Sequence, residues 1–513
     1  MKKQIFFGIL TILMLIITRA MPLFAVENTT TDSDINYWVR DALRHDERTD
    51  ASNIVVNSHD GIVTLSGEVT NLAAKNYADK EAKKIKGVLA VINEIIVKPQ
   101  FRPDSDIRNA VRRRILNSAV IKSEHIEVSA VDGRIILSGV VSSWSEALEA
   151  VTLASEVRGV KEVKNDITPH WKIERSDDEI KNDVMATLKR DVYLNGLPIK
   201  VSVNNGVVFL TGSVGNAYEK ERAKNDIGWI SQVKGIKNDI EIKWFMKRGT
   251  RMKEPSPSDI ELKKSVLAEL SQDSRVNSSD ITVKSTSGHV TLDGSVKTFY
   301  EKNIAVKDAN DVVGVGFVTN NLSVREEIRS DKFIQEDVDF NFDTDYTLGG
   351  FDIATKVKDG IVTLTGEVHT LYQKSHARDV ASRISGVKKI INRIAVHRTS
   401  WKTDVELTSQ IKARLNLNAI TWAVSANISV SVKNRAATLT GDVDTWSERR
   451  EAGRVAFLTE DIWKVDNRIT VKGHDYPWDE WHDKGTYEYD PYYDYYLDPF
   501  GPLYDNFYYS PMG

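Results

Sequence analysis

Val63-Thr64-Leu65-Ser66-Gly67-Glu68-Val69 is the key to the fold of this chain, because its pattern occurs six times in the 513 residues. The pattern is an apolar residue, a variable one, Leu, then Ser, Thr or Asp, then Gly, a variable residue and Val. Successive glycines of the pattern are separated by 72, 73, 82, 72 and 75 positions, and they are Gly67, Gly139, Gly212, Gly294, Gly366 and Gly441. Repetition at a nearly constant period predicts tandem copies of one structural unit.

Two further marks accompany each glycine. A turn dipeptide ends six positions before it, as in Asp60-Gly61, and only the sixth copy departs from the usual type, with Asn434-Arg435. An asparagine follows every glycine at one unchanging interval, and the six are Asn93, Asn165, Asn238, Asn320, Asn392 and Asn467. A constant interval means that the element between the two marks cannot change length. We expect each asparagine to hydrogen-bond the backbone at a sheet edge or turn.

The repeats divide the chain into six units, which we number in chain order. Their expected bounds are 33–99, 103–170, 176–244, 258–326, 330–398 and 403–472. Residues 245–257 contain Gly, Ser and two Pro, which predicts a linker between the third and fourth units. Residues 473–513 are rich in Tyr and Asp, fit no periodic template, and are expected to be a disordered tail.

Each unit has the same predicted order of elements. A helix comes first, as Ile107, Val111 and Ile115 recur at intervals of four. Two strands joined by the tight turn follow, then a helix with small residues such as Ala150 and Ala154, then a third strand. The expected fold is α+β, with a mixed three-stranded sheet and two helices on one face. The glycine of the pattern lies on the core side of its strand, which indicates a bulge or the close approach of a helix.

These marks make the chain resemble the BON domain family, named for bacterial OsmY and nodulation proteins. The resemblance rests on Val-x-Leu-x-Gly-x-Val together with a terminal Gly-Val-x-x-Val-x-Asn-x-Ile, as in residues 386–394. It covers residues 33–472, and it departs from the pattern where Gln232 and Asp461 replace the glycine of the terminal motif. It implies a non-catalytic protein of the bacterial envelope that attaches to phospholipid membranes.

Residues 1–25 have the features of a secretory signal peptide. Lys2 and Lys3 precede an apolar run from Ile5 to Ile17, and small residues follow at Ala20 and Ala25, either of which can mark the cleavage site. The run is shorter than the roughly 20 apolar residues that span a bilayer. We therefore expect an exported protein in the periplasm, with an uncleaved anchor as the alternative.

Composition and charge limit the chemistry. The chain has no cysteine, which excludes disulfides, thiolate nucleophiles and cysteine-ligated metals. It also lacks a phosphate-binding glycine loop and a His-Glu-x-x-His motif, so we expect no cofactor, no metal and no enzyme. The net charge of −4 combines −8 in the tail with +3 in residues 1–25, which leaves +1 for the body. A nearly neutral body does not favour nucleic acid as a partner.

Two sets of side chains are candidates for membrane contact. The first helix of the second unit carries Arg108, Arg112, Arg113 and Arg114, whose guanidinium groups suit phosphate headgroups. The alternative is a solvated helix face. Aromatic residues at the start of the second helices suit a membrane interface, or else fix the entry of the chain into each helix. This second set is Trp144, Phe299, Tyr300, Tyr372 and Trp446.

The sequence supports two hypotheses of function. The first is an envelope protein that binds phospholipid surfaces through several BON-like units at once and protects against osmotic or similar stress. The second is a scaffold that binds an envelope protein through sheet edges and the aromatic tail. The linker cations Lys247, Arg248, Arg251 and Lys253, and a metal bound by His474 and His482 of the tail, are lesser possibilities.

Overall fold

The computed structural model describes residues 30–46, 48–121, 125–141, 144–170, 175–243, 257–325, 329–396 and 402–472. The predicted signal peptide, the tail and the linker up to residue 256 lie outside the described residues.

Unit 1 has the predicted order of elements. Helix α1 (Asp32–Arg44) and the short 3-10 turn η1 (Ala51–Asn53) precede an antiparallel hairpin of β1 (Ile54–His59) and β2 (Ile62–Val69). Helix α2 (Leu72–Lys83) then leads to β3 (Ala90–Asn93) and β4 (Ile96–Val97), which both pair with β2 in parallel. The sheet is mixed, and the third predicted strand is bent into two short pieces.

The other five units repeat this order, which confirms the predicted α+β class. In units 2 and 3 the elements are α3 (Asp104–Leu116), β5 (Ile126–Val131), β6 (Arg134–Val141), α4 (Trp144–Ser155), β7 (Glu162–Pro169), α5 (Asp177–Arg190), β8 (Ile199–Asn204), β9 (Val207–Val214), α6 (Ala217–Ile227), β10 (Gly235–Asn238) and β11 (Glu241–Ile242). In units 4 and 5 they are α7 (Asp259–Gln272), η3 (Ser278–Asp280), β12 (Ile281–Thr286), β13 (His289–Val296), α8 (Phe299–Asp311), β14 (Phe317–Val324), α9 (Asp331–Thr344), β15 (Ile353–Lys358), β16 (Ile361–Val368), α10 (Leu371–Ser382), β17 (Lys389–Asn392) and β18 (Ala395–Val396). In unit 6 they are α11 (Asp404–Leu417), η4 (Ser425–Asn427), β19 (Ile428–Lys433), β20 (Ala436–Val443), α12 (Trp446–Phe457), β21 (Lys464–Asn467) and β22 (Thr470–Val471).

An aspartate at the start of each first helix closes the hairpin turn. In unit 2 the carboxylate of Asp104 accepts hydrogen bonds from the backbone N–H groups of Asp132 and Gly133, each at 2.8 Å. Asp32, Asp177, Asp259, Asp331 and Asp404 make the same pair of bonds in the other units. Both turn residues have positive φ, which the Asn434-Arg435 turn of unit 6 reproduces without glycine. This contact fixes the first helix on the hairpin.

The repeated asparagine links the second helix to the third strand. In unit 1 the side-chain amide of Asn93 donates to the carbonyl oxygen of Lys75 at 2.8 Å, and its oxygen accepts from the backbone N–H of Ile95 at 3.3 Å. The asparagines of units 3, 5 and 6 form the same two bonds. The expected backbone hydrogen bond is therefore confirmed in these units, where it accounts for the fixed spacing between glycine and asparagine.

The glycine of the pattern is required by the hairpin and not by a helix. A Cβ atom on Gly67 would lie 2.0 Å from the carbonyl oxygen of Asn53, the residue that precedes β1. The same contact recurs at the corresponding glycine of every unit, where φ lies between +105° and +134°. The close approach that the sequence predicts is present, but the neighbour is the partner strand instead of the helix.

The units associate in three pairs, which are 1 with 6, 2 with 5, and 3 with 4. The residues after the helices of one unit form short antiparallel bridges with those of the other, such as Val157 with Asp345 and Ser118 with Ile384. Equivalent bridges join Asp191 to Val312 and Ile85 to Asn418. Each pair thus has an approximate two-fold arrangement, and of the three pairs only units 3 and 4 are consecutive in the chain.

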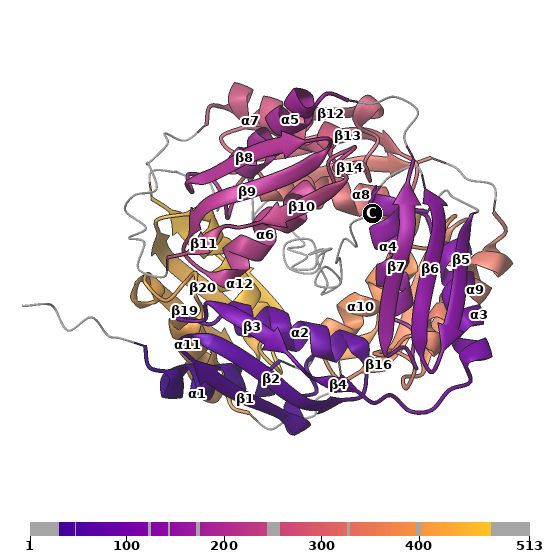
Figure 1. The fold of residues 1–513 in the computed structure, drawn as a ribbon, viewed down its shortest axis with the longest axis horizontal. Helices are drawn as coiled ribbons and strands as arrows, with labels where there is room; N and C mark the ends of the chain where they lie inside the picture. The colour runs from indigo at the N-terminus through magenta and orange to yellow at the C-terminus, as the bar shows by residue number, and fades with distance from the viewer. Residues whose placement is uncertain are drawn as a thin grey trace, which may run out of the picture.

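The three pairs close into a ring (Figure 1). The second helices of the six units line its inner side, and the first helices lie toward the periphery, where α3 is next to α9 and α5 is next to α7. Buried apolar side chains continue between pairs, since one core cluster joins units 1 and 2 and another joins units 3 and 6. The ring is therefore held together by side chains as well as by the chain itself.

Candidate functional surfaces

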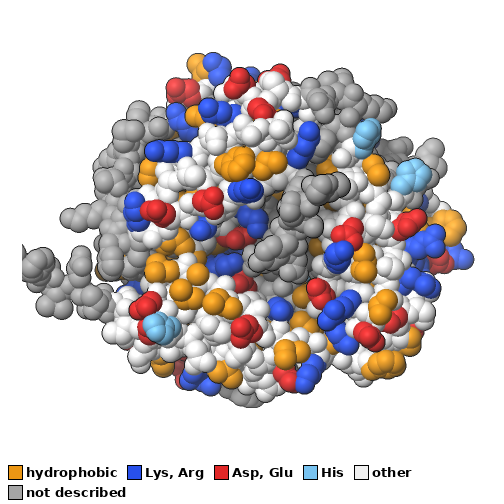
Figure 2. Space-filling model, in the orientation of Figure 1, with side chains coloured by type: hydrophobic (Ala, Val, Ile, Leu, Met, Phe, Trp, Pro, Cys, Tyr) orange, Lys and Arg blue, Asp and Glu red, His pale blue; other side chains and the backbone are white. Residues whose placement is uncertain are grey.

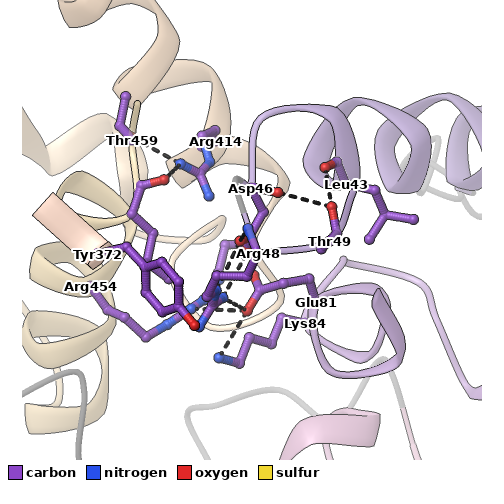
Figure 3. Close-up of polar contacts among 12 residues, drawn as sticks. Leu43, Asp46, Arg48, Thr49, Glu81, Lys84, Tyr372, Arg414, Arg454 and Thr459 are labelled. Carbon is purple, nitrogen blue, oxygen red and sulfur yellow. Dashed lines mark hydrogen bonds and ion pairs between the residues drawn. The ribbon is translucent and has the colours of Figure 1, made fainter. Parts of the chain in front are cut away.

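The junction of units 1 and 6 contains a buried network of charges. Figure 3 shows Arg48, Lys84 and Arg454 directed at the carboxylate of Glu81, with the ring of Tyr372 beside them. The nitrogen-to-oxygen distances to Glu81 are 2.8 Å from Arg48, 3.5 Å from Lys84 and 3.1 Å from Arg454. Burial opposes the ionisation of Glu81, yet the charges of Arg454, Lys84 and Arg48 hold its pKa well below the usual value. The Glu81 carboxylate is therefore ionised, and its ion pair with Arg454 joins unit 1 to unit 6.

Comparable networks occupy the other two pair junctions. Between units 2 and 5, Arg383 of unit 5 contacts Glu149 and Glu156 of unit 2 at 3.5 and 3.4 Å. In the pair of units 3 and 4, Arg222 of unit 3 contacts Asp311 of unit 4 at 3.3 Å, and Arg190 contacts Glu269 at 3.0 Å. Because these groups are desolvated and paired with each other, they fix the arrangement of units.

The four arginines of α3 differ in their exposure to solvent. Arg114 is 1% exposed, and its side chain contacts Asp345 and Glu156 at 3.4 and 3.5 Å. Arg113 pairs with Asp337 at 3.0 Å and lies over the ring of Phe340. Arg108 and Arg112 are exposed. The prediction of a four-arginine headgroup site is wrong for Arg114, because α3 packs on unit 5 with that face.

The aromatic residues at the second-helix starts lie in the interior. Phe299, Tyr300, Tyr372 and Trp446 are between 3% and 7% exposed. Tyr372 of unit 5 meets Tyr77 of unit 1 edge to face at 6.3 Å, and its hydroxyl lies 2.9 Å from that of Tyr346. Tyr300 of unit 4 reaches Glu149 of unit 2 at 3.5 Å. Tyr300 and Tyr372 thus form contacts between units. Because all four aromatic side chains are buried, they are not available for contact with a membrane.

Trp144 begins α4, and its side chain lies outside the described residues, as do the cations of the linker and the histidines of the tail.

An open groove lies between α3 of unit 2 and α9 of unit 5. Leu116 and Phe333 are each 58% exposed in it, next to the exposed Arg112. In Figure 2 the right-hand edge of the molecule, where α3 and α9 lie, carries basic, acidic and apolar side chains together. The complete lining is Asn109, Arg112, Arg113, Leu116, Asn117, Arg329, Phe333, Glu336 and Asp337. Sequence reasoning found Arg112 but missed Phe333, since nothing in the sequence places α9 beside α3.

One group of possible metal ligands occurs among the described residues. Ligand atoms of Asp32, His59 and Asp60 lie within 4.8 Å of one another. The oxygens of Asp32 already accept hydrogen bonds from the hairpin turn, and no histidine stands at the position of His59 in the other units. The aspartate therefore has a structural role that all six units share.

No helix among the described residues has both the length and the apolar character needed to cross a membrane.

In the repeated unit an aspartate of the first helix binds the hairpin turn, and an asparagine of the third strand binds the second helix. These features define a class of small α+β modules found in tandem. A family profile described as BON domain matches residues 31–99, 103–168, 176–243, 258–326, 330–398 and 403–473. The chain therefore belongs to the BON domain family.

Curated relatives cover about two units of this chain. Osmotically-inducible protein Y of Escherichia coli strain K12 is 32% identical over 149 residues, which are 28% of this chain and 74% of that protein. The outer membrane lipoprotein DolP of Haemophilus influenzae is 31% identical over 138 residues, 26% of this chain and 71% of DolP. A 21 kDa hemolysin of Actinobacillus pleuropneumoniae is 30% identical over 115 residues, 21% of this chain and 59% of the hemolysin.

Among solved structures, the C-terminal domain of CdsD, a structural protein of the type III secretion system of Chlamydia trachomatis, aligns with 42% of this chain and 99% of that domain. The TM-score is 0.12 and the sequence identity 15%.

Proposed function

We propose that this protein is an exported, non-catalytic component of the bacterial envelope that attaches to anionic phospholipid surfaces and protects the envelope under osmotic stress. The relatives include an osmotically inducible protein and an outer membrane lipoprotein, which supports this setting. The observation that carries the membrane contact is the groove between α3 and α9. There Arg112 stands exposed beside Leu116 and Phe333, and Arg108 is exposed one turn earlier on α3. Cations next to apolar side chains suit the headgroup region of a bilayer.

The test is co-sedimentation of the full chain with vesicles of phosphatidylcholine, with and without phosphatidylglycerol. Each basic residue near an anionic surface contributes about 1 kcal/mol, so the Arg108→Gln/Arg112→Gln variant should bind about 30-fold more weakly. The control variant Lys263→Gln/Lys264→Gln removes two exposed cations from α7 and should bind like the unchanged protein. Equal sedimentation of the arginine variant and the unchanged protein would exclude the groove.

A second candidate function is a scaffold for a protein partner, and the sheets of units 1 and 2 favour it. Their outer faces expose seven aliphatic side chains at 36% to 61%, and Figure 2 shows apolar groups on this side of the ring. These residues are Val55, Ile62, Ile92, Ile96, Val131, Ile136 and Val140. Among the described residues, the outer sheet faces of units 3 to 6 expose no large aliphatic side chain to this degree. Recovery of one envelope protein by the full chain, lost on Ile92→Ser/Ile96→Ser substitution, would support a scaffold.

A further inference from the structure

The outer face of the sheet in unit 5 differs from the other five in its charge. At four corresponding positions unit 5 has Lys356, Lys358, Lys389 and Arg393, which we call the cationic face. Units 1 to 3 have no Lys or Arg at these positions, and unit 4 has only Lys284, which pairs with Asp293. Unit 6 has three, but its Arg468 pairs with Asp466. The comparison within one chain singles out unit 5.

The four cations flank the first half of the central strand β16, where the outward-facing residues Ile361, Thr363 and Thr365 carry no charge. Lys358 and Lys389 lie on either side of Ile361, because β15 pairs with β16 at Ile361 and β17 pairs with the same residue. Lys356 lies next to Thr363 by the same register. Neighbouring strands are about 4.8 Å apart, so rows of cations stand roughly 10 Å apart across the central strand. All four side chains are exposed, since both helices of unit 5 cover the opposite side of the sheet.

The cations of this face outnumber its carboxylates, since the outward-facing residues of β16 add only Glu367, near the end of the strand. Within the part of the chain that the structure describes, none of the four cations forms an ion pair. Burial lowers the pKa of the neighbouring Lys302, and the charges of Lys389 and Arg378 lower it further. A lysine that feels this repulsion indicates a positive potential around the edge of the sheet.

A polyanion that could cover the face is part of the same chain. Residues 473–513 contain nine Asp or Glu, one Lys and ten Tyr, with a net charge of −8. They begin after β22 of unit 6, which adjoins unit 5 where Leu371 packs near Phe457 and Ile462. An extended chain spans up to about 3.3 Å per residue, so a segment of this length reaches far beyond one unit. Tethering also gives the segment a high effective concentration at the face.

We propose that the acidic, tyrosine-rich segment 473–513 docks on the cationic face of unit 5. Its carboxylates lie against the lysines and Arg393, while tyrosine rings cover Ile361 and Thr363 of the central strand. The docked segment shields the face from other anions, including phospholipid headgroups. This proposal does not depend on membrane attachment at the groove between α3 and α9, since the two surfaces share no residue.

The experiment is limited proteolysis of the full chain by chymotrypsin, which cleaves after tyrosine, at low salt. In the Lys356→Gln/Lys358→Gln/Lys389→Gln variant, cleavage within the segment should be at least tenfold faster than in the unchanged protein. The control variant Arg108→Gln/Arg112→Gln/Lys263→Gln loses the same charge elsewhere and should be cleaved at the unchanged rate. High salt should raise cleavage of the unchanged protein to that of the lysine variant.

A second readout is mapping of the links formed by a carbodiimide, which joins carboxylates directly to amines. Links from the segment to Lys356, Lys358 or Lys389 support the proposal, and links that concentrate on Lys433 and Lys464 of unit 6 overturn it. Cleavage rates that do not change in the lysine variant overturn it as well. If that variant loses only its binding to phosphatidylglycerol vesicles, the face belongs to the membrane and the docking proposal fails.

Discussion

Lys84 allows a quantitative test of the junction between units 1 and 6. Its side chain is 2% exposed, lies 3.5 Å from Glu81, and stands 4.8 Å from the ring centre of Tyr218 in unit 3. Burial and, after it, the charge of Arg454 together lower its pKa from 10.5 to about 7, although the charge of Glu81 opposes the change. A lysine at the meeting point of three units thus destabilises the ring whenever it carries a proton.

The sign and size of the effect follow from the two pKa values. Between pH 7 and pH 10.5 the unfolded chain holds the proton while the folded chain releases it, so the free energy of unfolding falls as the pH is lowered through this window and rises with pH. Each unit of pKa shift corresponds to about 1.4 kcal/mol, which gives a cost on the order of 5 kcal/mol at low pH. From pH 7 to pH 9 the unfolding free energy should increase by about 2 kcal/mol from this group.

The assay compares urea denaturation of the unchanged protein with that of Lys84→Met at pH 7 and pH 9. Methionine fills the site without a charge, and Glu81 keeps Arg48 and Arg454, so the variant should be as stable or more stable at pH 7. Its advantage should shrink by about 2 kcal/mol at pH 9. Lys98→Met, at an exposed ion pair, should show no such difference. An advantage of Lys84→Met that is the same at both pH values would contradict this account of the junction.

Three further substitutions test the local interactions that stabilise each unit. Gly67→Ala places a Cβ atom 2.0 Å from a carbonyl oxygen and should cost more than about 3 kcal/mol, while Gly350→Ala, with no atom within 4 Å of its Cβ, should leave the thermal midpoint unchanged. Asn467→Ala removes two hydrogen bonds from a residue that is 2% exposed and should cost about 1 to 3 kcal/mol in urea denaturation, whereas a loss below about 0.3 kcal/mol would contradict its structural role. Asp104→Ala leaves two turn N–H groups without their acceptor and should cost about 1 to 2 kcal/mol, which hydrogen exchange at Asp132 and Gly133 would localise to the hairpin.

The unit itself was predictable because its determinants are local. Gly67 and the turn at Asp60 act within the single hairpin of β1 and β2, and the fixed spacing to Asn93 reports one helix and one strand. Even so, the sequence predicted a bulge or the close approach of a helix at this glycine, because it does not show how closely the residue before β1 approaches.

The candidate site was only partly predictable, since it depends on which units meet. Arg112 and Arg114 are close neighbours on one helix, yet one faces solvent and the other is buried against Asp345 of unit 5. Tyrosine is a residue type that is common at membrane interfaces, but the ring of Tyr372 contacts Tyr77 of another unit. These outcomes follow from the packing of segments that lie far apart in the chain, for which the repeat pattern carries no signal.

Six copies of one module can be read from the amino acids alone, because hairpin turns, helix lengths and backbone contacts are set by residues close together in the chain. The pairing of units 1 and 6, 2 and 5, and 3 and 4, and the closure of these pairs into a ring, emerge only in the folded molecule. Six similar modules present similar surfaces, so their pairing depends on buried charges that differ between copies, such as Glu81 and Arg454, and on how the modules pack together.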